Sequence, residues 1–326
     1  MTLSARFVTL ATVVALFVLL VQAPREVQAG PVKKSVRVLY LVPKDREPRK
    51  DYQSAIEACV LDLQIWYFGH LKGKTFRLNH PIIEVMRTPH KAGWYDSNRP
   101  ASRPTKSMYW SNVGNDAAAL LRVKLYNNPN YIWLIYIDAP GGSGAGGAGV
   151  AVLPKHDLEG LIGRAANKMP VMRWIGGCGH ELGHAFGLPH PPRNSHHNAL
   201  MRNGHGGYER YPACYLTAED TQRLNHSPFI HPGRPDTFKG RGRFIYTYNG
   251  GYFVNVGGKE WEERKAGSDT IHYFSENGGD RDFIYLLDAS RKPGAWVALP
   301  KEGRGNGILF KWQGDESWRK LYKATE

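Results

Sequence analysis

Apolar side chains recur along the first two thirds of the chain with the periods of strands and helices. Residues 35–42 are rich in Val, Leu and Tyr, which predicts a buried strand. Residues 51–71 carry apolar side chains at helical spacing, and Asp51 stands where an N-cap is expected. The same pattern predicts a strand over residues 75–86, a helix over 115–126 and a strand over 131–138. This order of elements favours a mixed sheet covered by helices.

One short strand and two helices are predicted beyond this region. Residues 150–153 are apolar and fit a strand, and residues 174–186 fit a helix. Residues 216–225 fit a helix that begins at Thr217 and carries acidic side chains in its first turn. Acidic residues there are favourable because they face the positive end of the helix dipole.

The composition changes after residue 227. Pro228, Pro232 and Pro235 indicate a linker, and from about residue 240 short aromatic strands alternate with glycine turns. The strands are expected at residues 244–248, 252–256, 271–274, 283–287, 295–299 and 308–312. This regular pattern predicts a small all-β barrel or sandwich. Four tryptophans belong either to its core or to a surface that binds sugar or protein. They are Trp261, Trp296, Trp312 and Trp318.

The first residues have the pattern of an export signal. Arg6 precedes an apolar run over residues 7–21, and residues 27–29 (Val-Gln-Ala) form a small-residue cleavage site. The run is short for a membrane span, which needs about 20 residues. We therefore expect a secreted protein, or a periplasmic one in a Gram-negative bacterium, without stable membrane insertion after cleavage. An uncleaved anchor is the alternative.

The net charge of the chain limits the classes of partner that it is expected to bind. The 326 residues carry a formal net charge of +14 and a pI near 9.6. For an exported protein, this charge favours an acidic polymer or glycan as an additional partner. Lys and Arg are scattered, and no helix-turn-helix, zinc-finger or RNA-binding signature accompanies them. We therefore expect no nucleic-acid partner.

The sequence His-Glu-Leu-Gly-His-Ala-Phe-Gly-Leu-Pro-His, which begins at His180, forms a candidate zinc site with its own base. In a helix, His180 and His184 project from one face, so both imidazoles reach one metal ion. Glu181 lies one step round the helix, where a proton acceptor fits better than a ligand. Gly187 is free to take a positive φ and end the helix, and the turn delivers His190 as third ligand. Three histidines leave the fourth zinc position to water.

Met201 follows His190 after eleven residues, and at this point the chain resembles the metzincin clan of zinc endopeptidases. The clan's signature is H-E-x-x-H-x-x-G-x-x-H followed by a Met-turn. The resemblance implies that His180, His184 and His190 bind zinc. It also implies that Glu181 is the catalytic base and that Met201 lies beneath the metal.

The chain departs from some metzincin families near the methionine. Those families place a tyrosine ligand two residues after the methionine, where this chain has Asn203, so a tyrosine switch is not expected. Tyr208 and Tyr211 lie near enough in sequence to stabilise an oxyanion, although an ordinary packed or surface tyrosine is the simpler interpretation. No pro-region with a zinc-capping cysteine is visible. His196, His197 and His205 fit no recognised ligand spacing, so one catalytic zinc ion is expected.

Three cysteines allow at most one internal disulfide. The favoured pair is Cys178 with Cys214, because it would tie the zinc helix to the segment after the Met-turn. The alternative is three reduced thiols. Cys59 lies inside a predicted helix and is interpreted as a buried free thiol.

Residues 141–149 are rich in glycine, but no Gly-Lys-Ser/Thr follows, which argues against a nucleotide-binding loop. We expect a flexible loop that leads into the strand at residues 150–153. Proteases that this chain resembles hold an extended peptide on a sheet-edge strand. Residues 150–153 are the candidate for that edge, with a buried central strand as the alternative.

These inferences give an α+β fold. It consists of a signal peptide (residues 1–29), a zinc metallopeptidase catalytic domain (30–228), a linker (229–239) and a small all-β accessory domain (240–326). The expected catalytic domain has a mixed twisted sheet with helices, a zinc helix and a Met-turn subdomain. The expected function is a secreted, zinc-dependent endopeptidase of protein or peptide substrates, with Glu181 as general base. The alternatives are a zinc-dependent amidase of cell-wall or other non-protein amides, and a non-catalytic secreted binding protein.

Overall fold

A computed structural model describes most of the chain. The described residues are 34–97, 105–203, 206–233, 244–248, 251–265, 270–301 and 307–322. The predicted signal peptide and most of the predicted linker lie outside them. Within the described segments, none of the helices combines the length and the hydropathy of a membrane span.

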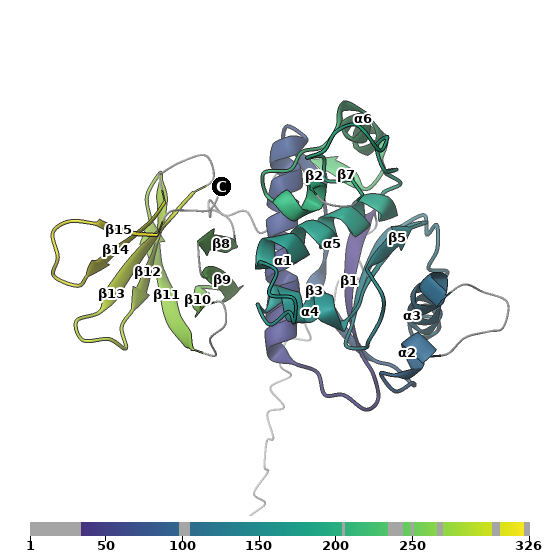
Figure 1. The fold of residues 1–326 in the computed structure, drawn as a ribbon, viewed down its shortest axis with the longest axis horizontal. Helices are drawn as coiled ribbons and strands as arrows, with labels where there is room; N and C mark the ends of the chain where they lie inside the picture. Colours follow the sequence, from purple (N-terminus) through teal and green to yellow (C-terminus); the bar gives the residue numbers. More distant parts are fainter. Residues whose placement is uncertain are drawn as a thin grey trace, which may run out of the picture. The chain divides into compact units, whose positions relative to one another are not determined.

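A five-stranded mixed sheet forms the centre of the first part of the chain (Figure 1). Its spatial order is β3-β1-β4-β6-β5, with four parallel strands and β5 antiparallel at one edge. The strands are β1 (Ser35–Val42), β3 (Leu78–Arg87), β4 (Tyr131–Ile137), β5 (Ala145–Gly147) and β6 (Val150–Leu153). The inner strands β1, β4 and β6 are mostly apolar because both of their faces are covered.

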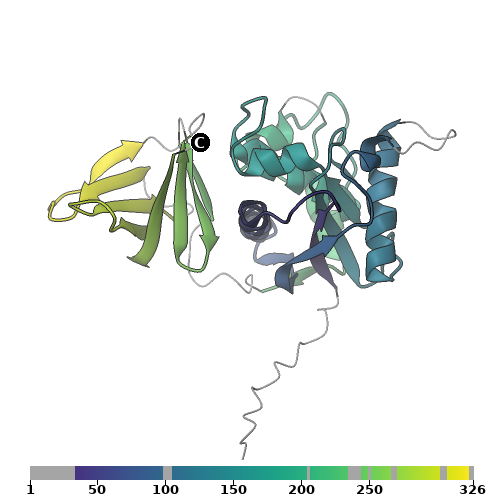
Figure 2. The ribbon, with the colours of Figure 1, turned by 90° about the horizontal axis from the view of Figure 1, so that it is seen from below.

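Helices cover both faces of this sheet, as Figure 2 shows. Val38 and Tyr40 of β1 pack in one apolar cluster with α1, α4 and α5. Leu39 and Leu41 pack in a second cluster with α2 and α3. Because side chains alternate along a strand, β1 fixes the register of both layers. The helices are α1 (Lys50–His70), α2 (Trp94–Ser97), α3 (Thr105–Leu121), α4 (Lys155–Leu161) and α5 (Val171–Ala185).

Four smaller elements complete this part. They are β2 (Lys74–Phe76), its antiparallel partner β7 (Ile230–Pro232), the 3-10 turn η1 (Gly207–Arg210) and α6 (Ala218–His226). The predicted start of α6 is confirmed. The Thr217 hydroxyl accepts the Asp220 N–H at 3.1 Å, and the Asp220 carboxylate accepts the Thr217 N–H at 3.0 Å. This capping box satisfies two backbone donors at the helix end.

The C-terminal part is one eight-stranded antiparallel sheet in which the strands pair in sequence order. The strands are β8 (Ile245–Tyr248), β9 (Gly251–Gly257), β10 (Glu260–Lys265), β11 (Ile271–Gly279), β12 (Phe283–Asp288), β13 (Ala295–Pro300), β14 (Ile308–Trp312) and β15 (Arg319–Tyr322). Trp261 is 1% exposed and packs in this sheet's own core. Trp296, Trp312 and Trp318 are half-buried.

The predicted N-cap of the first helix is wrong. Helix α1 begins at Lys50, Arg49 occupies the cap position, and Asp51 lies in the first turn. The Asp51 carboxylate accepts the Arg49 Nε–H at 3.0 Å and the Tyr52 N–H at 3.0 Å. A carboxylate in the first turn is favourable with the helix dipole, so Asp51 stabilises this helix end from inside.

Two other elements differ from the prediction in their extent. The strand predicted over residues 75–86 is divided, because β2 pairs with β7 whereas β3 pairs with β1. The helix predicted over residues 115–126 is α3, which ends at Leu121 because Arg122 has a φ of 54°. The sequence did not predict several short elements, which are α2, α4, β5, β7, β10, β15 and η1.

The three cysteines are buried and none of them is in a disulfide. The favoured Cys178–Cys214 disulfide is therefore not present, and the alternative of three reduced thiols describes the structure. Cys59 lies on α1 with its sulfur 3.7 Å from the Tyr136 hydroxyl of β4. It packs as a small apolar side chain between helix and sheet.

The capping box of α6 gives a test of the fold. Thr217→Ala is expected to lower the free energy of unfolding by about 1 kcal/mol, because it leaves a backbone donor without its acceptor. Urea denaturation measures this change. Thr221→Ala, inside the same helix, is the control. Equal unfolding free energies for the two variants would contradict a stabilising cap at Thr217.

Candidate metal centre

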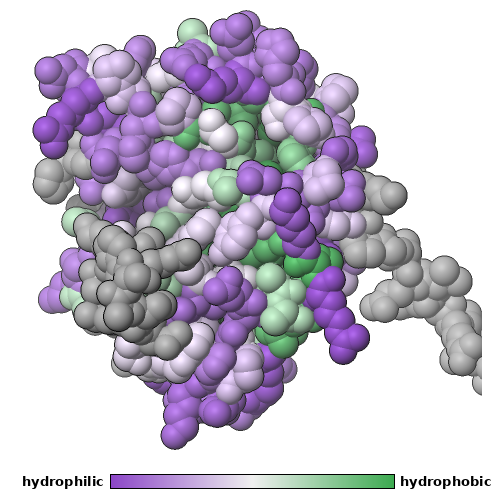
Figure 3. Space-filling model, turned by 90° about the vertical axis from the view of Figure 1, so that its right-hand side faces the viewer, coloured by the Kyte–Doolittle hydropathy of each residue, from purple (hydrophilic) through white to green (hydrophobic). Residues whose placement is uncertain are grey.

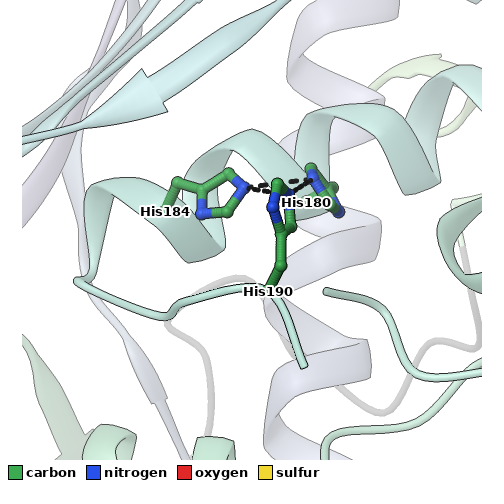
Figure 4. Close-up of side chains that lie close together, drawn as sticks. All are labelled: His180, His184 and His190. Atoms are coloured by element: carbon green, nitrogen blue, oxygen red, sulfur yellow. Dashed lines mark hydrogen bonds between the residues drawn. The ribbon is translucent and has the colours of Figure 1, made fainter. Parts of the chain in front are cut away.

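Three imidazole rings converge beside helix α5 (Figure 4). The Nε2 atom of His180 lies 3.1 Å from that of His184 and 3.1 Å from that of His190. The Nε2 atoms of His184 and His190 are 2.9 Å apart. His180 is 5% exposed, His184 is half-buried and His190 is exposed, so the cluster opens to solvent on one side. The spacing of His180 and His184 on one helical face is the predicted one.

Backbone carbonyl groups fix the orientation of two of these rings. The Nδ1 atom of His180 lies 2.8 Å from the Leu200 carbonyl oxygen, and Nδ1 of His184 lies 2.8 Å from the Leu188 carbonyl oxygen. A carbonyl oxygen only accepts, so each Nδ1 carries the proton and each Nε2 presents a lone pair. Lone pairs that face one another at about 3 Å repel unless a cation lies between them. The donor set therefore fits a metal ion.

The three histidines are also in the protonation state that a metal requires. Burial lowers the pKa of His180 to about 3, and it lowers the pKa of His184 and of His190. All three rings are therefore neutral near pH 7. Neutral imidazole is the form that binds metal, so no proton has to leave first.

A glycine turn delivers the third histidine. Gly187 has a φ of +91°, which a side chain would make unfavourable, and its N–H donates to the His184 carbonyl at 2.9 Å. The Leu188 N–H donates to the Gly183 carbonyl at 3.0 Å. These bonds end α5 and reverse the chain, so that His190 returns to the face that carries His184. The predicted role of Gly187 as the end of the helix is confirmed.

The segment around Met201 packs against α5 at Gly183. Met201 is fully buried, and a Cβ added to Gly183 would collide with its sulfur. Leu200, its neighbour, supplies the carbonyl that orients His180. The Leu200 N–H donates to the Tyr215 carbonyl at 2.8 Å, which holds this segment against the chain that follows.

Glu181 is a half-buried acidic residue that directly follows His180 on α5. Burial raises its pKa to about 7, and the negative charge of Asp157 adds to the rise. The charge of Arg173 and a hydrogen bond from the Gly146 backbone oppose it. A carboxyl whose pKa lies near the working pH is suited to take up and release a proton. A bound cation would act in the same direction as Arg173.

The sheet edge beside the cluster is β5, and the prediction that residues 150–153 form this edge is wrong. These residues are β6, which lies between β4 and β5, so the alternative of a central strand is correct. β5 comes from the glycine run that was predicted to be a flexible loop. A Cβ on Gly146 would collide with the Glu181 carbonyl and approach the His184 Cβ to 2.8 Å. Glycine is needed here because the strand backbone rests on the helix.

Three polar residues near the cluster were not assigned to it from the sequence. Asp157 is buried on α4, and Arg173 lies on α5 two turns before His180. The Tyr208 ring centroid lies 5.0 Å from that of His180. Of the three, only Tyr208 could be noticed in the sequence, because it follows the histidine motif and Met201 at a short distance. Tyr211 is different, because it is buried and donates to the Asp62 carboxylate at 2.8 Å.

The other histidines do not form a second centre in the part of the chain that the structure describes. There, the one group of metal-ligating side chains is His180, His184 and His190. His196 instead lies 3.2 Å from the Tyr215 hydroxyl. His205 lies outside the described residues.

A cavity of about 830 Å³ borders the C-terminal end of α5. Its wall includes Phe186 and Gly187 at the helix end, Ala148 and Gly149 after β5, and one side of α6. Figure 3 shows apolar residues among polar ones on one face of the molecule. The residues that line it do not include His180, Glu181, His184 or His190, so the cavity lies past the helix end and is not formed by the histidine cluster.

No family model matches the chain, and no curated protein matches it. Among solved structures, OgpA from Akkermansia muciniphila covers 86% of this chain and 90% of its own, with 16% identity and a TM-score of 0.43. A catalytically inactive OgpA in complex with an O-glycopeptide (glycodrosocin) covers 88% and 92%, with 15% identity and a TM-score of 0.42. Archaemetzincin from Methanopyrus kandleri covers 58% and 94%, with 19% identity and a TM-score of 0.28. Functional inference therefore rests on the residues of the site.

The contact of β5 with α5 is testable. Gly146→Ala is expected to lower the free energy of unfolding by about 1–3 kcal/mol, because its Cβ has no space beside Glu181 and His184. Gly142→Ala, where an added Cβ meets nothing within 4 Å, is the control and should change stability little. Thermal and urea unfolding measure both. If Gly146→Ala were as stable as Gly142→Ala, β5 would not rest on the helix.

Proposed function

We propose that this protein is a zinc-dependent endopeptidase of the metzincin type. His180, His184 and His190 would hold the ion, and Glu181 would be the general base. The observation that carries the proposal is the convergence of three Nε2 atoms within 3.1 Å of one another, next to the half-buried Glu181 with its raised pKa. Met201, which packs against Gly183, and Gly187 at the helix end complete the motif that the sequence shares with that clan.

In the proposed peptide hydrolysis, the zinc ion and the residues of the chain have different roles. A bound zinc ion supplies Lewis acidity, which makes water more acidic and polarises a carbonyl group. Glu181 accepts a proton from the attacking water and passes it to the leaving amine. Its partial burial beside Gly144 and Gly146 raises its pKa to about 7, which suits it to take up and release that proton. The Leu188 and Leu200 carbonyls hold two of the imidazoles in the orientation that the reaction needs.

The edge strand β5 suits an extended peptide. Among the described residues β5 pairs with β6 alone, so its other edge is open. Gly144 and Gly146 bring this edge to Glu181, and an extended chain that paired with it would pass over the histidines. The Asn127 N–H donates to the Ala148 carbonyl at 2.7 Å, directly after β5. This bond occupies the backbone at the end of the open edge, beside the cavity. This arrangement favours a peptide over a compact amide.

The proposal includes secretion of the protein and its division into a catalytic and an accessory domain. Residues 1–29 would direct secretion, residues 30–228 would form the catalytic domain, and residues 240–326 an accessory β domain. The charge of +14 would help the protein to bind acidic polymers or glycans. The alternative of a zinc-dependent amidase uses the same residues and differs only in substrate.

Metal binding gives the first test. The protein should bind one zinc ion, and free zinc at 100 times its Kd should stabilise the fold by about 2.7 kcal/mol. His184→Ala should lose this stabilisation, because one of three ligands is removed. His272→Ala in the β-sheet is the control. Calorimetry and thermal unfolding measure both effects, and undiminished zinc binding by His184→Ala would exclude the assigned ligand set.

The role of Glu181 gives the second test. Glu181→Gln and Glu181→Ala should keep zinc but lose peptide hydrolysis by a factor of about 10²–10⁴, because the proton acceptor is absent. Glu316→Gln, at an exposed carboxylate of the β part, should retain activity. Cleavage of a peptide library, followed by mass spectrometry, measures the rates. Activity of Glu181→Gln at the wild-type rate would exclude a general-base role. Hydrolysis of cell-wall amides without any peptide cleavage would favour the amidase.

A further inference from the structure

Arg173 is a half-buried guanidinium beside the histidine cluster. It lies on α5 seven residues before His180, which places both on the same face of the helix. Gly177 lies between them, and a Cβ there would meet the Arg173 Nη1 at 3.2 Å. The arginine side chain therefore runs over Gly177 toward His180, through space that any larger residue would fill.

The guanidinium is held by aromatic rings. Its Cζ lies 4.4 Å from the Trp174 ring centroid and 5.2 Å from the Tyr208 ring centroid. Nη2 lies 3.5 Å from the Tyr208 hydroxyl oxygen, a long hydrogen bond in which the phenol accepts. The Tyr208 proton is then free to donate elsewhere. Tyr208 also packs on His180, so the two donors stand together at the edge of the cluster.

No carboxylate within the described residues forms an ion pair with Arg173, in contrast to the partly buried Arg37 and Arg264. Arg37 pairs with Glu84, and Arg264 pairs with Glu262 at 2.6 Å. Arg173 and Glu181 act on each other through their charges. A partly buried cation without an ion-paired carboxylate is still costly, and it would be costlier beside a bound metal cation. Arg173 therefore has the properties of a site that receives an anion.

The direction of a bound peptide decides which part of it Arg173 meets. β5 runs in the same direction as α5, because Gly144 lies against Glu181 and Gly146 against both Glu181 and His184. Antiparallel pairing is the commoner and slightly more stable arrangement. A peptide antiparallel to β5 runs from the C-terminal end of α5 toward its N-terminal end. Its residues after the scissile bond would then approach Arg173.

We propose that Arg173 and Tyr208 form a subsite for an acidic side chain, Asp or Glu, on the C-terminal side of the scissile bond. The proposal rests on the endopeptidase function proposed above and adds a substrate class to it. The carboxylate would take charge-assisted hydrogen bonds from the guanidinium and a further bond from the Tyr208 hydroxyl. Seven residues of helix span about 10 Å and an extended peptide advances about 3.3 Å per residue, so the first three residues after the bond are the candidates.

Peptide pairs that differ only in charge test the subsite. Each pair carries Asp or its isostere Asn at the first, second or third position after the bond, with an amidated C-terminus so that no terminal carboxylate is present. At one position the zinc-loaded wild type should cleave the Asp peptide at least about tenfold faster in kcat/KM, because a charge-assisted bond contributes about 1.5–3 kcal/mol. Equal cleavage of both peptides at all three positions would overturn the proposal.

Variants assign the preference to the two residues. Arg173→Gln should abolish the Asp over Asn preference, and Tyr208→Phe, which keeps the ring, should reduce it a few-fold. Arg122→Gln, at an exposed arginine after α3, removes the same charge elsewhere and should leave the preference intact. A structural role for Arg173 would lower cleavage of both peptides equally. An unchanged Asp to Asn ratio in Arg173→Gln would therefore contradict the proposal.

Binding without turnover separates this proposal from the catalytic one. In a Glu181→Ala background, calorimetry should show at least about tenfold tighter binding of the Asp peptide, and Arg173→Gln should remove the difference. Arg173→Lys keeps the positive charge and should keep part of the difference in binding between the two peptides. It provides a second test if Arg173→Gln folds poorly. Loss of peptide cleavage with intact binding discrimination would reject the endopeptidase and keep the anion subsite. Peptide cleavage without any preference for Asp over Asn would reject the anion subsite and keep the endopeptidase.

Discussion

The close approach of four segments to helix α5 is the constraint on which the site depends. Tyr208, Leu63 and Met201 each touch the helix at a glycine, where a Cβ would collide or lie within 3 Å. β5 reaches the same helix through Gly146. A glycine inside a helix costs about 1 kcal/mol relative to alanine, so α5 is intrinsically weak. Packing offsets this cost. The neighbouring segments hold α5 in place, and α5 in turn positions the histidines, the Met201 segment and the sheet edge.

The electrostatics of the site follow from that packing. Burial keeps the imidazoles neutral and raises the pKa of Glu181, while backbone carbonyls direct the protons of His180 and His184 away from the centre. The repulsion among the exposed lone pairs is relieved by a cation. The same low-dielectric surroundings make the unpaired charge of Arg173 unfavourable until an anion arrives. Neutral donors, a poised carboxyl and an unpaired guanidinium thus share one environment.

The sequence predicted the parts of this protein that periodicity or a motif specifies. β1 and β6 match their predicted bounds because they are short segments rich in Val and Leu. The histidines meet because their spacing matches the helix. It missed β5, since a glycine-rich segment becomes a strand only when a helix lies against it. Arg173 and Asp157 also escaped prediction, because their role comes from tertiary contacts with Tyr208 and Glu181 that no local pattern encodes.

The acceptors that orient His180 and His184 are both main-chain oxygens, of Leu200 and Leu188. In many metal sites this outer support comes from carboxylate side chains, which a single substitution removes. Here the support survives any replacement at positions 188 and 200 that keeps the loop in place. Homologous chains are thus free to vary at both positions while they keep the same histidine geometry. An insertion or deletion that shifts either loop would be far more damaging than a change of residue.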